Sequence, residues 1–211
     1  MGLSQPMNGI LIMSKDDYAL LFPTTLWSSD ELISVEENDR IAEHIIENKD
    51  KIEGKGAESW FSGINSPTNS FAADFNSYNH PIFKNLLNCI DEKIKQYADL
   101  LKFRIEVIKS RDWWWNVYEN GNQYQEFHGH VPFYFSGVYF CKAPHGSAPI
   151  TFRHPNFNHF MPSYERNELN AECNSIEPIE RSLLIFPSNL IHCVSGGSNT
   201  EPRITISFNY G

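Results

Sequence analysis

The second half of the chain is a succession of short segments in which apolar and polar residues alternate, and this pattern limits the fold most. Such period-two segments are typical of β-strands, and each is closed by Pro, Gly or Asn. Asn120-Gly121 after the second segment is a tight-turn signal. Strands are expected at residues 104–108, 112–119, 133–141, 150–153, 182–186 and 203–209.

Helical patterns come before these strands. Ser34-Val-Glu-Glu37 is a capping box that predicts a helix of about 14 residues. His80-Pro81 opens a second predicted helix that runs to about Leu101, with apolar residues at helical spacing. Residues 19–27 read as a further strand with Pro23 at an edge position.

Helices followed by many short strands predict a mainly β fold with flanking helices. Two facing sheets of such strands would form a jelly roll or related barrel. The 211 residues suit one domain, and no linker or repeat divides residues 1–211. The Gly-, Ser- and Asn-rich residues 53–79 and the stretch 153–179 are expected to be irregular and to form a lid.

Charge and cysteine content narrow the function classes. The net charge is −9 and no block of Lys or Arg stands out, which argues against nucleic acid or an anionic membrane as partner. The four cysteines form no C-x-x-C pair, so free thiols in a reducing cytoplasm are expected. No signal peptide or transmembrane span is read, since the apolar run near the N-terminus is short. A homodimer is left open.

Three of the eight histidines form a candidate metal site. In a strand, residues i and i+2 point to the same face, so His128 and His130 could grip one ion, and Gly129 adds no bulk between them. His192 follows the apolar strand 182–186 and would be the distant third ligand. Three protein ligands leave positions for substrate and dioxygen, as iron chemistry requires. The alternative is that the spacing of His128 and His130 arose by chance. The remaining histidines of the strand-rich half are interpreted as solvated loop residues: His145, His154 and His159.

Arg203 begins the last predicted strand and gives it one polar face. Period two places Arg203, Thr205, Ser207 and Asn209 together, opposite an apolar face formed by Ile204, Ile206 and Phe208. A buried arginine is costly unless it meets an anion, which a dicarboxylate co-substrate would supply through a two-pronged salt bridge. An internal ion pair with a protein carboxylate is the alternative.

The same parity applies to residues 113–118. Asn116 and Tyr118 share a face with Trp114 and would offer hydrogen bonds inside the cavity, whereas Trp113, Trp115 and Val117 would pack beneath the helices. In the strand 133–141 the pattern leaves open whether Ser136 or Tyr139 faces the metal.

These pieces, in this order, resemble the Fe(II)/2-oxoglutarate-dependent oxygenases, most closely a little-characterised group of marine bacteria and phages related to prolyl hydroxylases. The likeness is carried by Leu-Phe-Pro-Thr-Thr-Leu-Trp27, Trp-Asn-Val-Tyr118, Gln-Glu-Phe-His128-Gly-His130, Ser136-Gly-Val-Tyr-Phe140, Leu-Leu-Ile-Phe-Pro-Ser188, His192 and Arg203-Ile-Thr-Ile-Ser-Phe-Asn209. It implies a double-stranded β-helix (jelly-roll) core with Fe(II) and 2-oxoglutarate as cofactors.

By position the resemblance also implies residue roles. Iron would bind His128, His130 and His192, and the far carboxylate of 2-oxoglutarate would bind Arg203 and Ser207. Tyr118 matches a co-substrate-binding position of related prolyl hydroxylases.

The chain departs from the wider family at two positions. The family has Asp or Glu where this chain has His130, and Glu126 is the alternative carboxylate because 126, 128 and 130 would share strand parity. Glu180-Arg181 stands where Gly is expected, and Arg181 is a lesser rival to Arg203 as the carboxylate anchor.

The sequence therefore predicts an oxidoreductase, a 2-oxoglutarate-dependent dioxygenase that acts as a hydroxylase. Two other functions stay open: a three-histidine cupin-type dioxygenase without 2-oxoglutarate, and a non-enzymatic ligand-binding jelly roll. The primary substrate, a small molecule or a peptide side chain, is unknown. Gln123, Tyr124 and Phe160 are candidates for substrate contact.

Overall fold

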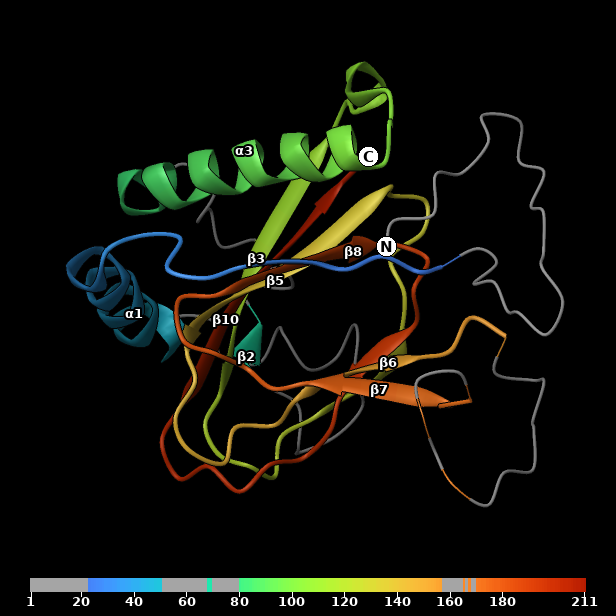
Figure 1. Ribbon diagram of the computed structural model, residues 1–211. Helices are drawn as coiled ribbons and strands as arrows, with labels where there is room; N and C mark the ends of the chain where they lie inside the picture. The colour runs from blue at the N-terminus through green and yellow to red at the C-terminus, as the bar shows by residue number, and fades with distance from the viewer. Residues whose placement is uncertain (1–22, 51–67, 70–79, 157–164, 166, 168–169) are drawn as a thin grey trace, which may run out of the picture.

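Two antiparallel sheets face each other in the computed structural model, which describes residues 23–50, 68–69, 80–156, 165, 167 and 170–211 (Figure 1). The larger sheet runs in the order β1 (Trp27–Ser29), β8 (Leu183–Pro187), β5 (Phe135–Lys142), β10 (Arg203–Tyr210), β3 (Arg111–Tyr118) and β2 (Thr68–Asn69). The smaller sheet runs in the order β4 (Gln125–His128), β9 (His192–Val194), β6 (Ile150–Arg153) and β7 (Cys173–Ile176).

The chain from β3 to β10 is wound as a jelly roll. The pairs are nested: β3 lies against β10, β4 against β9, β5 against β8 and β6 against β7. Pairing first with last and second with second-last is what results when one long hairpin is rolled into two sheets. The expected mainly β fold with a double-stranded β-helix core is therefore confirmed.

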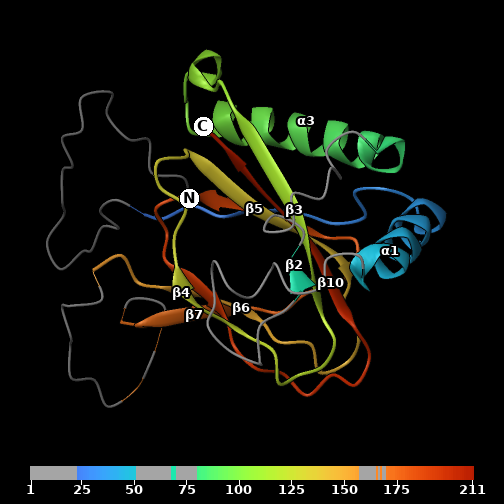
Figure 2. The same cartoon turned by 180° about the vertical axis from the view of Figure 1, so that it is seen from behind.

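Two helices cover the outer face of the larger sheet (Figures 1 and 2). Helix α1 (Val35–Lys49) begins as the capping box predicts, because the Ser34 Oγ accepts a hydrogen bond of 3.2 Å from the Glu37 N–H. Helix α3 (Lys84–Leu100) follows a 3-10 turn, η4 (Pro81–Phe83), so the second predicted helix is confirmed as well. No helix in the described part of the chain is both long and apolar enough to cross a membrane.

Alternation along β3 and β10 divides the interior. Trp115 of β3 and Ile206 of β10 are fully buried against the helices, together with their neighbours of the same parity. The open question in β5 is also decided: the Tyr139 hydroxyl donates to the Asn38 Oδ1 of α1 at 2.8 Å, whereas Ser136 bonds to Ser188 and Asn209 on the side between the sheets.

Three local predictions were wrong. Residues 104–108 form the 3-10 turn η5 (Ile105–Val107) instead of a strand, because they only connect α3 to β3 and bond locally. Of the predicted strand 19–27, residues 19–22 lie outside the described residues and residues 23–26 are irregular, so that only Trp27 belongs to a strand. The stretch 153–179, expected to be irregular, contains β7, which pairs with β6. Most of the expected lid at 53–79 lies outside the described residues.

Candidate metal centre and co-substrate cavity

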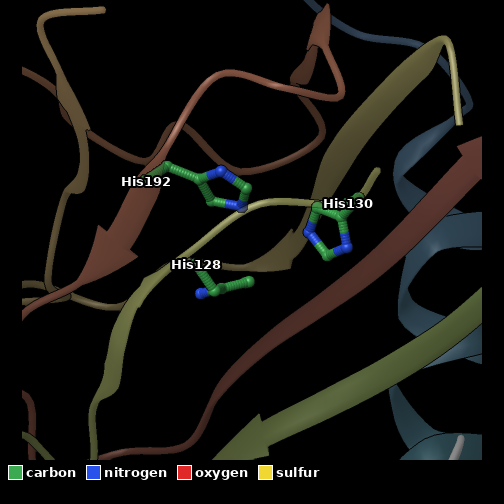
Figure 3. Close-up of side chains that lie close together, drawn as sticks. All are labelled: His128, His130 and His192. Atoms are coloured by element: carbon green, nitrogen blue, oxygen red, sulfur yellow. The ribbon is translucent and has the colours of Figure 1, made fainter. Parts of the chain in front are cut away.

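Three imidazole rings meet between the two sheets (Figure 3). His128 is the last residue of β4, His192 is the first of β9, and the two are opposite each other in the strand register. His130 follows two residues after the end of β4. One ring nitrogen from each lies within 4.8 Å of the others, a grouping that could hold one metal ion.

The backbone that positions His130 differs from the prediction, which placed this residue within a strand. A bulge between Gln125 and His128 breaks the alternation of β4, and the strand ends before His130. The His130 N–H instead donates to the Ser188 carbonyl at 2.8 Å. A Cβ on Gly129 would lie 3.1 Å from the Ile191 side chain, which would have to shift by a few tenths of an ångström.

Backbone carbonyls orient two of the three rings. The Nδ1 of His128 lies 2.7 Å from the Glu126 carbonyl oxygen, and the Nδ1 of His192 lies 2.9 Å from that of Leu190. A carbonyl oxygen only accepts, so each Nδ1 carries the proton and each Nε2 keeps a free lone pair. This is the arrangement by which outer hydrogen bonds fix a metal-binding histidine.

Burial keeps these imidazoles neutral. Desolvation lowers the pKa of His192 to about 3 and that of His130 to about 4, and it also lowers the pKa of His128. Neighbouring histidines lower the first two further. Neutral imidazole is the form that binds a metal, so the three rings are ready ligands at neutral pH.

Arg203 lies at the start of β10 and is 1% exposed. Its guanidinium carbon is 4.6 Å from the centroid of the Tyr118 ring and 5.6 Å from that of Phe140. Nε and Nη1 have no hydrogen-bond partner among the described residues. Burial lowers the pKa of this guanidinium, against the effect of Tyr118, and burial raises the pKa of Tyr118 itself.

The hydroxyl residues of β10 share this polar side. Thr205 and Ser207 border the cavity, and Asn116 lies behind them and donates its Nδ2 to both hydroxyls at 3.3 and 3.2 Å. Asn116 is thus placed to orient the two hydroxyls, although the sequence suggested that it faces the cavity itself.

A single cavity of about 170 Å³ joins the histidines to Arg203. Three neutral nitrogen donors suit a divalent transition metal, and a buried guanidinium with free N–H groups suits a carboxylate. Both halves of an Fe(II) and 2-oxoglutarate site therefore fit the residues present. The candidate residues that border this cavity are Tyr118, His128, His130, His192, Arg203, Thr205 and Ser207.

The rival residues lie elsewhere. Glu126 is exposed and does not belong to the histidine group, because the bulge removes the parity that it was expected to share with His128. Arg181 donates to the Glu31 carboxylate at 3.0 Å and to the Ile33 carbonyl at 3.2 Å. It takes a φ of 65°, so an arginine occupies the left-handed position where glycine was expected.

The described candidates for substrate contact do not line the cavity. The Gln123 side chain accepts from the Glu119 N–H, and Tyr124 is 40% exposed and lies outside the cavity lining. His145 and His154 are exposed, as expected, whereas Phe160 and His159 lie outside the described residues. Sequence reasoning missed Asp112, which borders the cavity and has the parity of Trp114.

The family of the chain follows from comparison with known proteins. A family model described as "Putative 2OG-Fe(II) oxygenase" matches residues 112–209, a segment that contains every candidate site residue. The second half of the chain, residues 112–209, thus matches this oxygenase family. The oxygenase is an oxidoreductase whose cofactors are Fe(II) and 2-oxoglutarate. This match favours the oxygenase over both alternatives left open by the sequence, the cupin-type dioxygenase and the non-enzymatic binding module.

Solved structures share the fold of this oxygenase at low sequence identity. A prolyl-4-hydroxylase from Pseudomonas putida has a TM-score of 0.62 and 10% identity, over 89% of this chain and 92% of its own. A Trichoplax adhaerens prolyl hydroxylase, in complex with a peptide fragment of hypoxia inducible factor, has a TM-score of 0.59 and 13% identity, over 88% and 82%. HygX from Streptomyces hygroscopicus, with nickel and 2-oxoglutarate bound, has 0.57 and 12%, over 89% and 83%. No curated protein matches the sequence.

Proposed function

We propose that the oxygenase is a hydroxylase in which His128, His130 and His192 hold the Fe(II). Their neutral imidazoles, their mutual approach within 4.8 Å and the fixed Nε2 atoms of two of them support this assignment. Bound iron supplies the activation of dioxygen. The exposed Glu126 then stays outside the ligand set, and its backbone carbonyl serves to orient His128.

A three-histidine set has a consequence for charge. Three neutral ligands leave the full +2 charge of Fe(II), where a carboxylate ligand would reduce it to +1. The dianionic 2-oxoglutarate offsets that charge, so metal and co-substrate should bind with mutual reinforcement. The same ligand set leaves three coordination positions for co-substrate and dioxygen.

Arg203 anchors the far carboxylate of 2-oxoglutarate, and this part of the proposal rests on one observation: a buried guanidinium with unpaired N–H groups borders the same cavity as the histidines. An unpaired buried charge is costly, and within the described residues no carboxylate pairs with it. Ser207 and Thr205 add hydroxyl donors, and Tyr118 closes the other side of the guanidinium.

The reaction has a defined balance. A substrate C–H bond becomes C–OH with one oxygen atom of dioxygen, and the other atom enters the succinate that forms as 2-oxoglutarate loses carbon dioxide. The side chains hold the co-substrate, and apolar residues such as Phe186 and Val138 line the cavity and keep water from it.

The setting of the enzyme is also proposed. Residues 1–211 act as one catalytic domain in the cytoplasm, where the free thiols of the described cysteines would persist. The primary substrate is a small molecule or a peptide side chain. The similarity of the fold to two prolyl hydroxylases supports a peptide by analogy alone.

Anaerobic titration tests the assignment. Purified protein should bind about one Fe(II), and 2-oxoglutarate should bind to the metal-loaded form. Screening of candidate substrates for stimulated release of succinate would then follow. Failure of 2-oxoglutarate to bind the iron-loaded protein would contradict the proposed use of Arg203.

A further inference from the structure

The cavity carries an acidic group at the end opposite to Arg203. Asp112 is the second residue of β3, on the same face as Trp114 and Tyr118, and it pairs with Asn209 across the sheet. Tyr118 pairs with Arg203 in the same register. Asp112 and Tyr118 are six positions apart along the strand, a distance of about 20 Å at the usual rise. Both ends border the cavity.

The Asp112 carboxylate has no partner within the part of the chain that is described. The neighbouring Arg111 points to the other face, where its Nη1 donates to both carboxylate oxygens of Asp91, at 2.8 and 2.7 Å. Asp112 takes part in no such pair, although it is partly buried. A carboxylate that borders a cavity without a protein cation is free to bind a cation from outside.

The position of the metal centre divides the cavity between two molecules. The Trp114 ring centroid lies 5.8 Å from that of His130, so the histidines face the middle of β3. The five-carbon backbone of 2-oxoglutarate is too short to extend from Arg203 to Asp112. The Asp112 end therefore remains for the primary substrate, about 7 Å along the strand beyond Trp114.

We propose that Asp112 binds a positively charged group of the primary substrate, so that this oxygenase hydroxylates an ammonium or guanidinium compound. Trp114 and Phe133 line the same end and offer aromatic surface to a cation. The charged group would be several bonds away from the carbon that is oxidised, because Asp112 lies beyond Trp114 as seen from the histidines. The inference rests on the proposed function and specifies its substrate class.

Paired probes test the charge preference. L-lysine and L-arginine are compared with norleucine and citrulline, whose side chains are neutral, both as free amino acids and as the central residue of glycine-flanked tripeptides. The tripeptides have acetylated and amidated ends, so that the side chain carries their only ammonium or guanidinium group. Binding to protein loaded with Fe(II) and 2-oxoglutarate is measured anaerobically by calorimetry, and succinate release is measured in air. The free and tripeptide arms separate a small-molecule substrate from a peptide side chain.

The expected result is that at least one charged probe binds roughly ten-fold or more tightly than its uncharged counterpart, as a charge-assisted hydrogen bond would give. Asp112→Asn should abolish this preference, and Asp112→Glu should retain part of it. Asp99→Asn is the matched control, because it removes the same charge from the exposed side of α3 and should change nothing.

Two results would overturn the proposal: no charged probe binds the wild-type protein better than its counterpart, or the preference persists in Asp112→Asn. The affinity for 2-oxoglutarate, measured first on each variant, reports separately on the proposed function. If the wild-type protein does not bind 2-oxoglutarate, the oxygenase assignment has failed, independently of the results with the probes.

Discussion

The two faces of β10 are built for opposite purposes. On the helix side, Ile204, Ile206 and Phe208 are almost completely buried in a continuous apolar core. On the cavity side, the same strand presents Arg203 and Thr205, which are as deeply buried but polar. Burial stabilises the first face, whereas it makes the second costly until a ligand binds. Changes on one face should therefore alter stability, and changes on the other should alter ligand binding.

The largest effect is expected at the metal centre. His192→Ala should abolish stoichiometric binding of Fe(II), because two remaining imidazoles are too few for a stable site. Metal analysis after anaerobic loading measures this, with Glu126→Gln as the control because that carboxylate is exposed and outside the histidine group. A variant that still retained one iron per chain would show that the three histidines are not the site.

The second prediction concerns Arg203, the charged residue on the cavity face of β10. Arg203→Met keeps most of the volume and removes the charge, so 2-oxoglutarate affinity should fall by about 2–5 kcal/mol, as for loss of one partner of a buried charge pair. Arg203→Lys should lie between, since lysine keeps the charge but loses the planar fork. Calorimetry on Mn(II)-loaded protein gives the affinities.

Thermal unfolding of the metal-free Arg203→Met variant sharpens this prediction. Without 2-oxoglutarate the guanidinium is a buried, incompletely bonded cation, so its removal should not destabilise the protein. A marked loss of stability with unchanged 2-oxoglutarate affinity would instead favour an internal ion pair.

A third prediction concerns pH. The pKa of His192 is about 3 and that of His130 about 4 in the folded protein, against roughly 6.5 in an unfolded chain. The unfolded state therefore takes up protons first as the pH falls. The metal-free protein should be most stable above pH 6.5 and lose stability toward pH 4, by at most about 1.4 kcal/mol per pH unit for each histidine.

Denaturant unfolding between pH 7 and pH 5 measures this dependence. His192→Asn removes one of the buried imidazoles and should make the dependence less steep. An unfolding free energy that did not change over this range would mean that the histidines are not buried in the neutral form.

Site residues could be predicted from the sequence only in strands where the side chains alternate regularly between the two faces. This alternation held along β3 and β10, where both faces are packed, so the positions of Trp115, Ile206 and Arg203 could be predicted. It failed in β4, an edge strand whose bulge shifts Glu126 away from His128. His130 was a sound candidate because of its residue type and spacing, but a loop hydrogen bond to Ser188 positions it.

Asp112 shows a different limit. Its parity could have been read from the same rule as Trp114, yet a single aspartate at the start of a strand carries no signal by itself. Only the shared cavity and the lack of a protein cation distinguish it. Likewise, β7 could not be predicted because its four residues, Cys173–Ile176, lack an alternating pattern and are ordered by pairing with β6.

The smallest expected effects come from two adjacent residues of β10, and they test the comparison most directly. Ile206→Val removes one buried methylene from the helix side and should lower the free energy of unfolding by about 0.5–1.5 kcal/mol. Thr205→Val keeps the shape of the side chain but removes the hydroxyl that accepts from Asn116 in the cavity wall. Because Thr205 and Ser207 share that donor, the loss should weaken 2-oxoglutarate binding by about 0.5–1.5 kcal/mol, the net value of one hydrogen bond.

Denaturant unfolding of metal-free protein and calorimetry of metal-loaded protein, applied to both variants, separate the two effects. Ile206→Val should leave the 2-oxoglutarate affinity unchanged. If it weakened that affinity as much as Thr205→Val did, the two faces of the strand would be energetically coupled, and the division between a stabilising face and a binding face would not hold.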